Sequence, residues 1–90
     1  MKAPSSSPAA AAQQWRDAAA IHIDVRGLAP PAPLVAIVRL IESVADATPV
    51  IVHDDRDPKL LYAELAERGW SAETIAGDAG EVRLMLQRQS

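Results

Sequence analysis

The sequence predicts an α+β domain, an α/β two-layer sandwich with two helices on one face of a mixed, four-stranded sheet. Two observations carry this prediction. Strand-like and helix-like patterns of apolar residues alternate along the chain in the order βαβαββ. The chain has 90 residues, which allow one hydrophobic core and do not allow two. Two layers packed around a single core satisfy both observations.

The beginning of the chain differs from the rest. Residues 1–18 are rich in serine, proline and alanine and offer few side chains for a core, so we predict a disordered tail there. The folded domain then spans residues 19–90. Trp15 is an exception within the tail, and we expect its ring either to fold back onto the domain or to contact a partner.

A proline-rich loop separates the first strand from the first helix. Ile21, Ile23 and Val25 alternate with polar residues, as in a strand with one apolar face. Prolines forbid a helix before Pro33, which is itself allowed in a first helical turn. From there to about Ala47 the spacing predicts an amphipathic helix, whose apolar stripe is Leu34, Ile37, Val38, Ile41 and Val44.

The second half of the chain repeats this order and ends in a hairpin. Residues 49–53 form a short apolar run that is typical of an interior strand. Asp57 is suited to cap the second helix, and Pro58 to occupy its first position. Residues 70–76 and 82–87 are two further strands around a glycine-rich turn, and the register of this hairpin stays open by one residue.

The expected topology leaves one face of the sheet partly open to solvent. Both strand–helix–strand connections should be right-handed, which places both helices on the same face. His22 and Asp24 then project from the other face. An open sheet face can support a dimer but does not require one, so we expect a monomer or a weak dimer.

Composition excludes several classes of function. The chain has no cysteine, which excludes a disulfide scaffold, a thiolate metal site and a thiol nucleophile. Its net charge is -3 and its nine basic residues are scattered, so nucleic-acid binding is not expected. We find no signal peptide and no apolar run approaching the roughly 20 residues of a membrane helix. We therefore expect a cytoplasmic protein with no membrane contact.

The loop after the first strand resembles the signature of the TusA (SirA-like) superfamily. Those proteins have a strand ending in Asp-x-x-Gly-Leu, followed by Cys-Pro-x-Pro at the start of the first helix. The residues that fit are Asp24, Gly27, Leu28, Pro31 and Pro33. The resemblance covers about residues 20–88 and implies a βαβαββ fold. Members with the cysteine carry sulfur as a persulfide, but Pro30 stands at that position here, so sulfur transfer is not expected.

A cysteine-less branch of this superfamily, described as a domain of unknown function, is the closer likeness. Its pattern is Asp-x-Arg-Gly-Leu-x-Pro-Pro-x-Pro, followed later by Asp-Pro and a leucine. Arg26, Pro30 and Asp57-Pro58 fit this branch better than they fit the sulfur carriers. Members of the branch occur beside hemerythrin-like domains and redox enzymes, which implies a link to redox or nitrogen-oxide metabolism.

Polar residues follow the first two strands at the strand ends where ligands often bind in parallel sheets. Each of these strand ends leads into a helix N-terminus, which favours anions. If the two strands are neighbours, Asp24 and His53 can pair on the open face. The candidates for ligand or partner contact are Asp24, Arg26, Gly27, Leu28, Pro30, Pro31, Pro33, His53, Asp55 and Arg56.

Two functions fit these candidates. The leading hypothesis is a non-enzymatic accessory or regulatory domain, whose rigid proline loop presents an apolar surface to a protein partner. The alternative is a small-anion, metal or haem module, for which His22 and His53 are the candidate metal ligands, with a weak signal because their spacing is not diagnostic. No enzymatic activity and no cofactor are predicted. In the simplest interpretation, the polar residues form exposed ion pairs that each contribute little to the stability of the fold.

Overall fold

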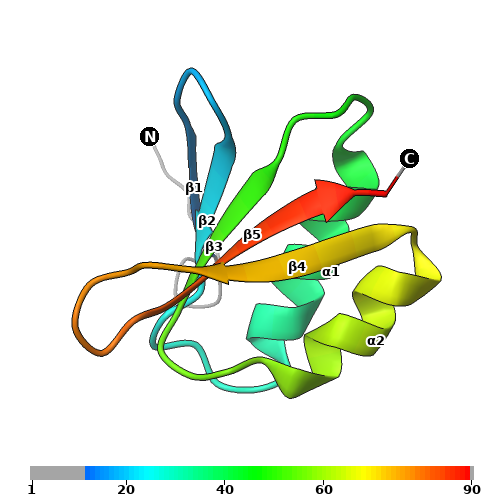
Figure 1. The fold of residues 1–90 in the computed structure, drawn as a ribbon. Helices are drawn as coiled ribbons and strands as arrows, with labels where there is room; N and C mark the ends of the chain where they lie inside the picture. The colour runs from blue at the N-terminus through cyan, green and yellow to red at the C-terminus, as the bar shows by residue number, and fades with distance from the viewer. Residues whose placement is uncertain (1–11, 90) are drawn as a thin grey trace, which may run out of the picture.

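The computed structural model describes residues 12–89, which form a five-stranded sheet with two helices packed on one face (Figure 1). The elements are β1 (Gln13–Arg16), β2 (Ile21–Asp24), α1 (Ala32–Ser43), β3 (Val50–Asp54), α2 (Lys59–Glu67), β4 (Trp70–Ile75) and β5 (Val82–Arg88). The strand order is β1-β2-β3-β5-β4, with β2 and β3 parallel and the other neighbours antiparallel. The mixed α+β architecture is confirmed, and the four-strand prediction is wrong by one strand.

The additional strand, β1, lies in the segment for which we predict a disordered tail. It pairs antiparallel with β2 at the edge of the sheet, with Trp15 opposite His22. All four of its side chains are exposed, so it has none of the alternating burial from which strands are predicted. The Asp17 carboxylate closes the following turn by accepting the backbone N–H groups of Ala19 and Ala20, both at 2.8 Å. Residues 1–11, the rest of the predicted tail, lie outside the described residues.

The core lies between the helices and the apolar face of the sheet. The pairing register aligns the apolar residues across β2, β3 and β5, with Ile23 opposite Val52 and Val52 opposite Leu84. Their side chains are fully buried against the inward faces of both helices. The fully buried residues in the helices include Ile37 and Ile41 of α1 and Leu61 and Leu65 of α2.

The structure resolves the register of the C-terminal hairpin. Trp70 is opposite Arg88, and Glu73 is opposite Met85. Trp70 is buried on the helix side, with the Arg88 guanidinium 5.4 Å from its ring centroid, whereas Glu73 is exposed. Because a single-residue slip would exchange these two faces, burial of the large indole ring accounts for the observed register.

Both helices differ from the prediction at their ends. The α1 helix stops at Ser43, whose hydroxyl donates to the Leu40 carbonyl at 2.6 Å, rather than near Ala47. The α2 helix begins at Lys59, one residue late, and no side chain caps its start. The carboxylate of Asp57, the expected cap, instead accepts a 2.6 Å hydrogen bond from the Tyr62 hydroxyl. None of the helices within residues 12–89 has the length and apolar character needed to cross a membrane.

Candidate functional site

The sequence-predicted site residues fall into two groups on different surfaces. The first group forms an apolar pocket of about 300 Å³, here called the proline groove. Its walls include Leu28, Pro30 and Pro31 from the β2–α1 loop, Pro33 from the start of α1, and Leu60 and Leu61 from the start of α2. These two segments meet because β2 and β3 are parallel neighbours, so their carboxyl ends lie at the same edge.

Backbone contacts hold the two loops of the proline groove together. The Val25 N–H donates to the His53 carbonyl at 2.9 Å, and the Gly27 N–H donates to the Asp55 carboxylate at 3.2 Å. Gly27 has a positive φ of 81°, which lets the chain turn away from β2. The hydrogen bond from Gly27 also lowers the pKa of Asp55. Asp55 therefore positions the loop.

Asp54 and Leu60 contribute to the groove although the sequence analysis did not select them. Asp54 lines the groove, is only 2% exposed and accepts the Asp55 N–H at 2.8 Å. Burial raises the pKa of Asp54. Leu60 is 77% exposed, whereas its neighbour Leu61 is buried in the core. Two adjacent leucines at a helix start were a usable signal, because only one of them can face the core.

The two arginines near the groove do not form an open anion site. Arg26 makes two hydrogen bonds to the Asp24 carboxylate, from Nε at 3.0 Å and from an Nη at 2.8 Å. These bonds lower the pKa of Asp24. Arg56 is exposed and lies 3.7 Å from Asp55. The expected pairing of Asp24 with His53 is wrong, although the two are opposite each other in the sheet, because each has other partners.

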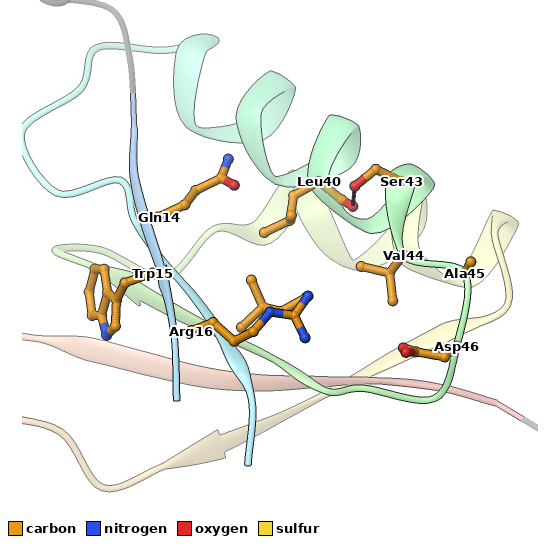
Figure 2. Close-up of a pocket in the computed structure, with 9 residues that line it drawn as sticks. Gln14, Trp15, Arg16, Leu40, Ser43, Val44, Ala45 and Asp46 are labelled. Atoms are coloured by element: carbon orange, nitrogen blue, oxygen red, sulfur yellow. Dashed lines mark hydrogen bonds between the residues drawn. The ribbon is translucent and has the colours of Figure 1, made fainter. Parts of the chain in front are cut away.

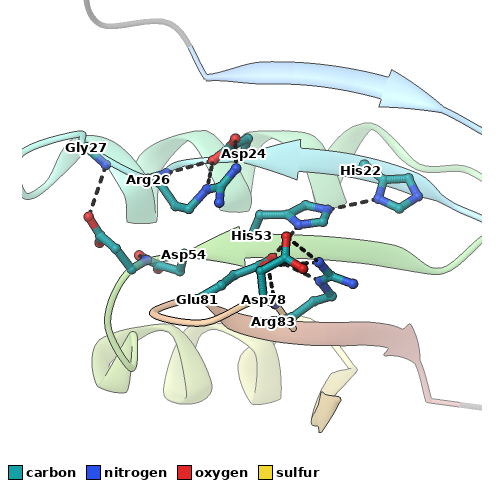
Figure 3. A network of polar contacts seen from close by, with 10 residues as sticks. His22, Asp24, Arg26, Gly27, His53, Asp54, Asp78, Glu81 and Arg83 are labelled. Atoms are coloured by element: carbon teal, nitrogen blue, oxygen red, sulfur yellow. Dashed lines mark hydrogen bonds and ion pairs between the residues drawn. The ribbon is translucent and has the colours of Figure 1, made fainter. Parts of the chain in front are cut away.

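The second group, here called the histidine cluster, lies on the sheet face that the helices leave open (Figure 3). His22 Nδ1 is 3.0 Å from His53 Nε2. The outer nitrogens contact carboxylates: His22 Nε2 is 2.8 Å from Asp17 Oδ2, and His53 Nδ1 is 2.5 Å from Glu81 Oε2. The cluster therefore joins the β1–β2 turn, β2, β3 and the end of the β4–β5 loop.

Glu81 anchors the cluster through its contact with His53. Its side chain is 1% exposed, and its carboxylate accepts hydrogen bonds from Arg83 at 2.8 and 2.9 Å and from the Asp78 N–H at 2.9 Å. The Arg83 bonds are the main cause that lowers the pKa of Glu81 to about 2. Sequence analysis missed Glu81, because nothing in the chain order indicates that the β4–β5 loop returns to β3.

Trp15 covers the cluster from β1. Its ring stacks on both imidazoles, with centroids 5.1 Å from His22 and 5.3 Å from His53. Of the two expectations for this ring, folding back onto the domain is the one observed. The indole nevertheless remains 44% exposed and accessible from solvent.

The family of the chain follows from its sequence match. The profile of a family described as an uncharacterized conserved protein, DUF2249, matches residues 22–88. The chain belongs to the DUF2249 family. No curated protein matches the chain. The matched segment contains the whole proline groove together with His22, His53 and Glu81, whereas Trp15 and Asp17 precede it.

A further cavity of about 390 Å³ lies where α1 ends short of the edge strand (Figure 2). Its polar lining comes from Gln14 and Arg16 of β1, from Ser43 at the end of α1 and from Asp46 in the loop that follows. The β1 wall of this cavity lies outside the segment that the DUF2249 profile matches. Across residues 12–89, no set of three or more histidine, aspartate or glutamate side chains is placed to hold a metal ion.

Proposed function

We propose that the chain is a non-enzymatic accessory or regulatory domain that binds an apolar segment of a protein partner in the proline groove. The observation that carries this proposal is an apolar concavity of about 300 Å³ at the carboxyl ends of two parallel strands. Pockets that bind ligands are mostly apolar with a few polar groups, and they favour this end of a sheet. Leu60, 77% exposed at the groove, is unfavourable in water and would be covered by a partner.

The rigidity of the groove supports the same proposal. Three prolines in one wall restrict the backbone, and the Gly27–Asp55 hydrogen bond joins this wall to the other. A preformed surface loses little conformational entropy on binding, so even a modest apolar contact area can give measurable affinity.

The TusA-like relationship remains part of this proposal. Pro30, which stands at the cysteine position of that superfamily, lines the groove. With no cysteine in the chain, persulfide chemistry is not available to it. We infer that the surface used for thiol chemistry in sulfur carriers serves here, in the cytoplasm, for docking alone.

The small-anion alternative is weaker. Both arginines near the two helix starts have acidic neighbours, since Arg26 is paired with Asp24 and Arg56 lies near Asp55, which leaves Lys59 as the remaining basic residue in the lining of the groove. Asp54 and Asp57 also line the groove. An incoming anion would meet carboxylates at the positions where it needs free donors.

The test is a matched pair of charge substitutions. Leu60→Asp places a charge in the groove, and Val35→Asp places one at an exposed position of α1 that does not line the groove. A partner is identified by photocrosslinking from residue 60 and purified, and its affinity for each variant is measured by calorimetry. We expect Leu60→Asp to weaken binding at least ten-fold and Val35→Asp to leave it unchanged. Equal effects of the two substitutions would contradict a groove-centred interaction.

A further inference from the structure

The two histidines of the chain direct nitrogen atoms at each other. His22 Nδ1 and His53 Nε2 are 3.0 Å apart (Figure 3). The other nitrogen of each ring contacts a carboxylate, Asp17 for His22 and Glu81 for His53. A carboxylate accepts hydrogen bonds, so each neutral imidazole places its N–H on its acid and its lone pair toward the other ring. Two lone pairs at this distance repel each other unless a proton or another cation lies between them.

This arrangement is the one that metal-binding histidines adopt. A histidine that ligates a metal usually donates its second N–H to a carboxylate, which fixes the tautomer and makes the ligating nitrogen more basic. Here Asp17 serves His22 and Glu81 serves His53 in that way. Arg83 and the Asp78 N–H hold the Glu81 carboxylate in place, so this support is itself anchored.

We propose that His22 and His53 form a two-imidazole site for a d-block metal ion, and that the ion is Cu(I). Two nitrogen ligands suffice for Cu(I), a soft d10 ion that accepts low coordination numbers. Zn²⁺ prefers four ligands, and Ca²⁺ and Mg²⁺ prefer six or more oxygens. The residues described by the structure supply no third acidic or imidazole ligand here, which disfavours the ions of higher coordination.

Trp15 supports a monovalent cation at this position. Its ring stacks on both imidazoles, so a cation between the nitrogens would lie beside an indole face, the best aromatic partner for a cation. The same ring shields one side of the site from water. A site with two neutral ligands, an aromatic wall and little water matches Cu(I) better than a strongly hydrated ion.

Binding requires a small opening of the pair. Bonds to nitrogen of about 2.0 Å place the two ligand atoms about 4 Å apart in a linear complex, and closer in a bent one. The nitrogens must therefore separate by at most about 1 Å. The His22 side chain is the more exposed of the two, at 16% against 10% for His53, and it is the one expected to move.

The experiment is an anaerobic Cu(I) titration of the full chain against a chromophoric Cu(I) chelator. We expect one ion per chain, with NMR shifts confined to His22, His53 and Trp15, since Cu(I) is diamagnetic. His22→Asn and His53→Asn should each weaken binding at least ten-fold. The double variant retains both methionines and gives the background, and its NMR spectrum reports whether the fold persists.

A second pair of variants tests the supporting carboxylate. Asp17→Asn should weaken Cu(I) binding about ten-fold. Asp46→Asn is the matched control, because Asp46 also accepts a backbone N–H in a turn but contacts neither histidine. Unchanged affinity in the double histidine variant would overturn the site. Tighter binding of Zn²⁺ than of Cu(I) by the same two histidines would overturn the assignment of the ion.

Discussion

The proline groove and the histidine cluster each contain a buried carboxylate, and the two acids behave in opposite ways. Glu81 in the cluster receives hydrogen bonds from Arg83, which lower its pKa to about 2. Asp54 in the groove has no cationic partner among its hydrogen bonds, and burial raises its pKa. Desolvation disfavours the charge of both acids, and only Glu81 has arginine hydrogen bonds that outweigh it.

The comparison assigns different roles to the two regions. The cluster joins four segments of the chain and pairs both of its carboxylates, so it contributes to the fold and also presents two imidazole nitrogens to a ligand. The groove exposes apolar surface and holds a carboxylate at a cost in stability, which is typical of binding sites rather than of cores.

The adjacent leucines of α2 should give the largest difference in stability. Leu61→Ala removes a fully buried side chain and should lower the free energy of unfolding by about 3 kcal/mol. Leu60→Ala, at the exposed groove position, should change it by less than about 0.5 kcal/mol. Urea denaturation followed by circular dichroism measures both. Comparable losses would mean that the groove wall belongs to the core.

Glu81→Gln tests the cluster as a structural network. The neutral amide leaves Arg83 and His53 without a charged acceptor in a buried setting, so we expect a loss of about 2 kcal/mol. Glu73→Gln, on the exposed surface of β4, is the control and should be neutral. The same urea titration measures the free energy of unfolding of both variants. An equally small loss in the two would show that the cluster does not stabilise the fold.

The pH dependence of stability should separate the two acids. Glu81 has a folded pKa of about 2 against an ordinary value of 4.5, so its stabilising contribution is complete above pH 4.5 and is lost as the pH falls toward 2. Asp54 has a folded pKa raised above its ordinary value of 3.8. Its charge therefore destabilises the fold at neutral pH, and this loss of stability is relieved as the pH falls from the raised pKa toward 3.8.

Thermal melts between pH 2 and pH 6 should therefore show a shallower acid loss in Glu81→Gln and a steeper one in Asp54→Asn than in the wild type. If both variants shift the profile in the same direction, the contrast between the two carboxylates is wrong.

Trp15→Leu should have the smallest effect on global stability. The ring is 44% exposed and belongs to an edge strand, so we expect a loss of at most about 1 kcal/mol. Hydrogen exchange should nevertheless accelerate in β1 and at the His22 amide. Unchanged exchange in β1 would show that the turn at Asp17 alone holds this strand.

The fold follows largely from local patterns in the chain. Alternation at Ile21 and Ile23, and the proline-delimited start of α1, predict the elements because the apolar period is set by backbone geometry. The β1 strand could not be found in this way. Its side chains are all exposed, and its pairing with β2 depends on backbone hydrogen bonds, which leave no trace in residue type.

The candidate site was predicted only in part, for a similar reason. The proline loop was recognisable because a proline ring restricts its own backbone φ angle whatever its surroundings in the fold. The partner of His53 was not, since Glu81 is 28 residues away and approaches only through the hairpin. The sequence suggested Asp24 instead, on the basis of strand adjacency, but Arg26 two residues away holds that carboxylate.

The sequence by itself determined the order of the elements, the apolar face of each and the stiffness of the loop at Pro30, because these depend on residues close in the chain. Tertiary structure alone decided the hairpin register, the depth of the proline groove and the contacts of Glu81 with His53 and Arg83. These features arise where distant segments meet. Their energies depend on burial and on the local balance of charge, which only the packed structure defines.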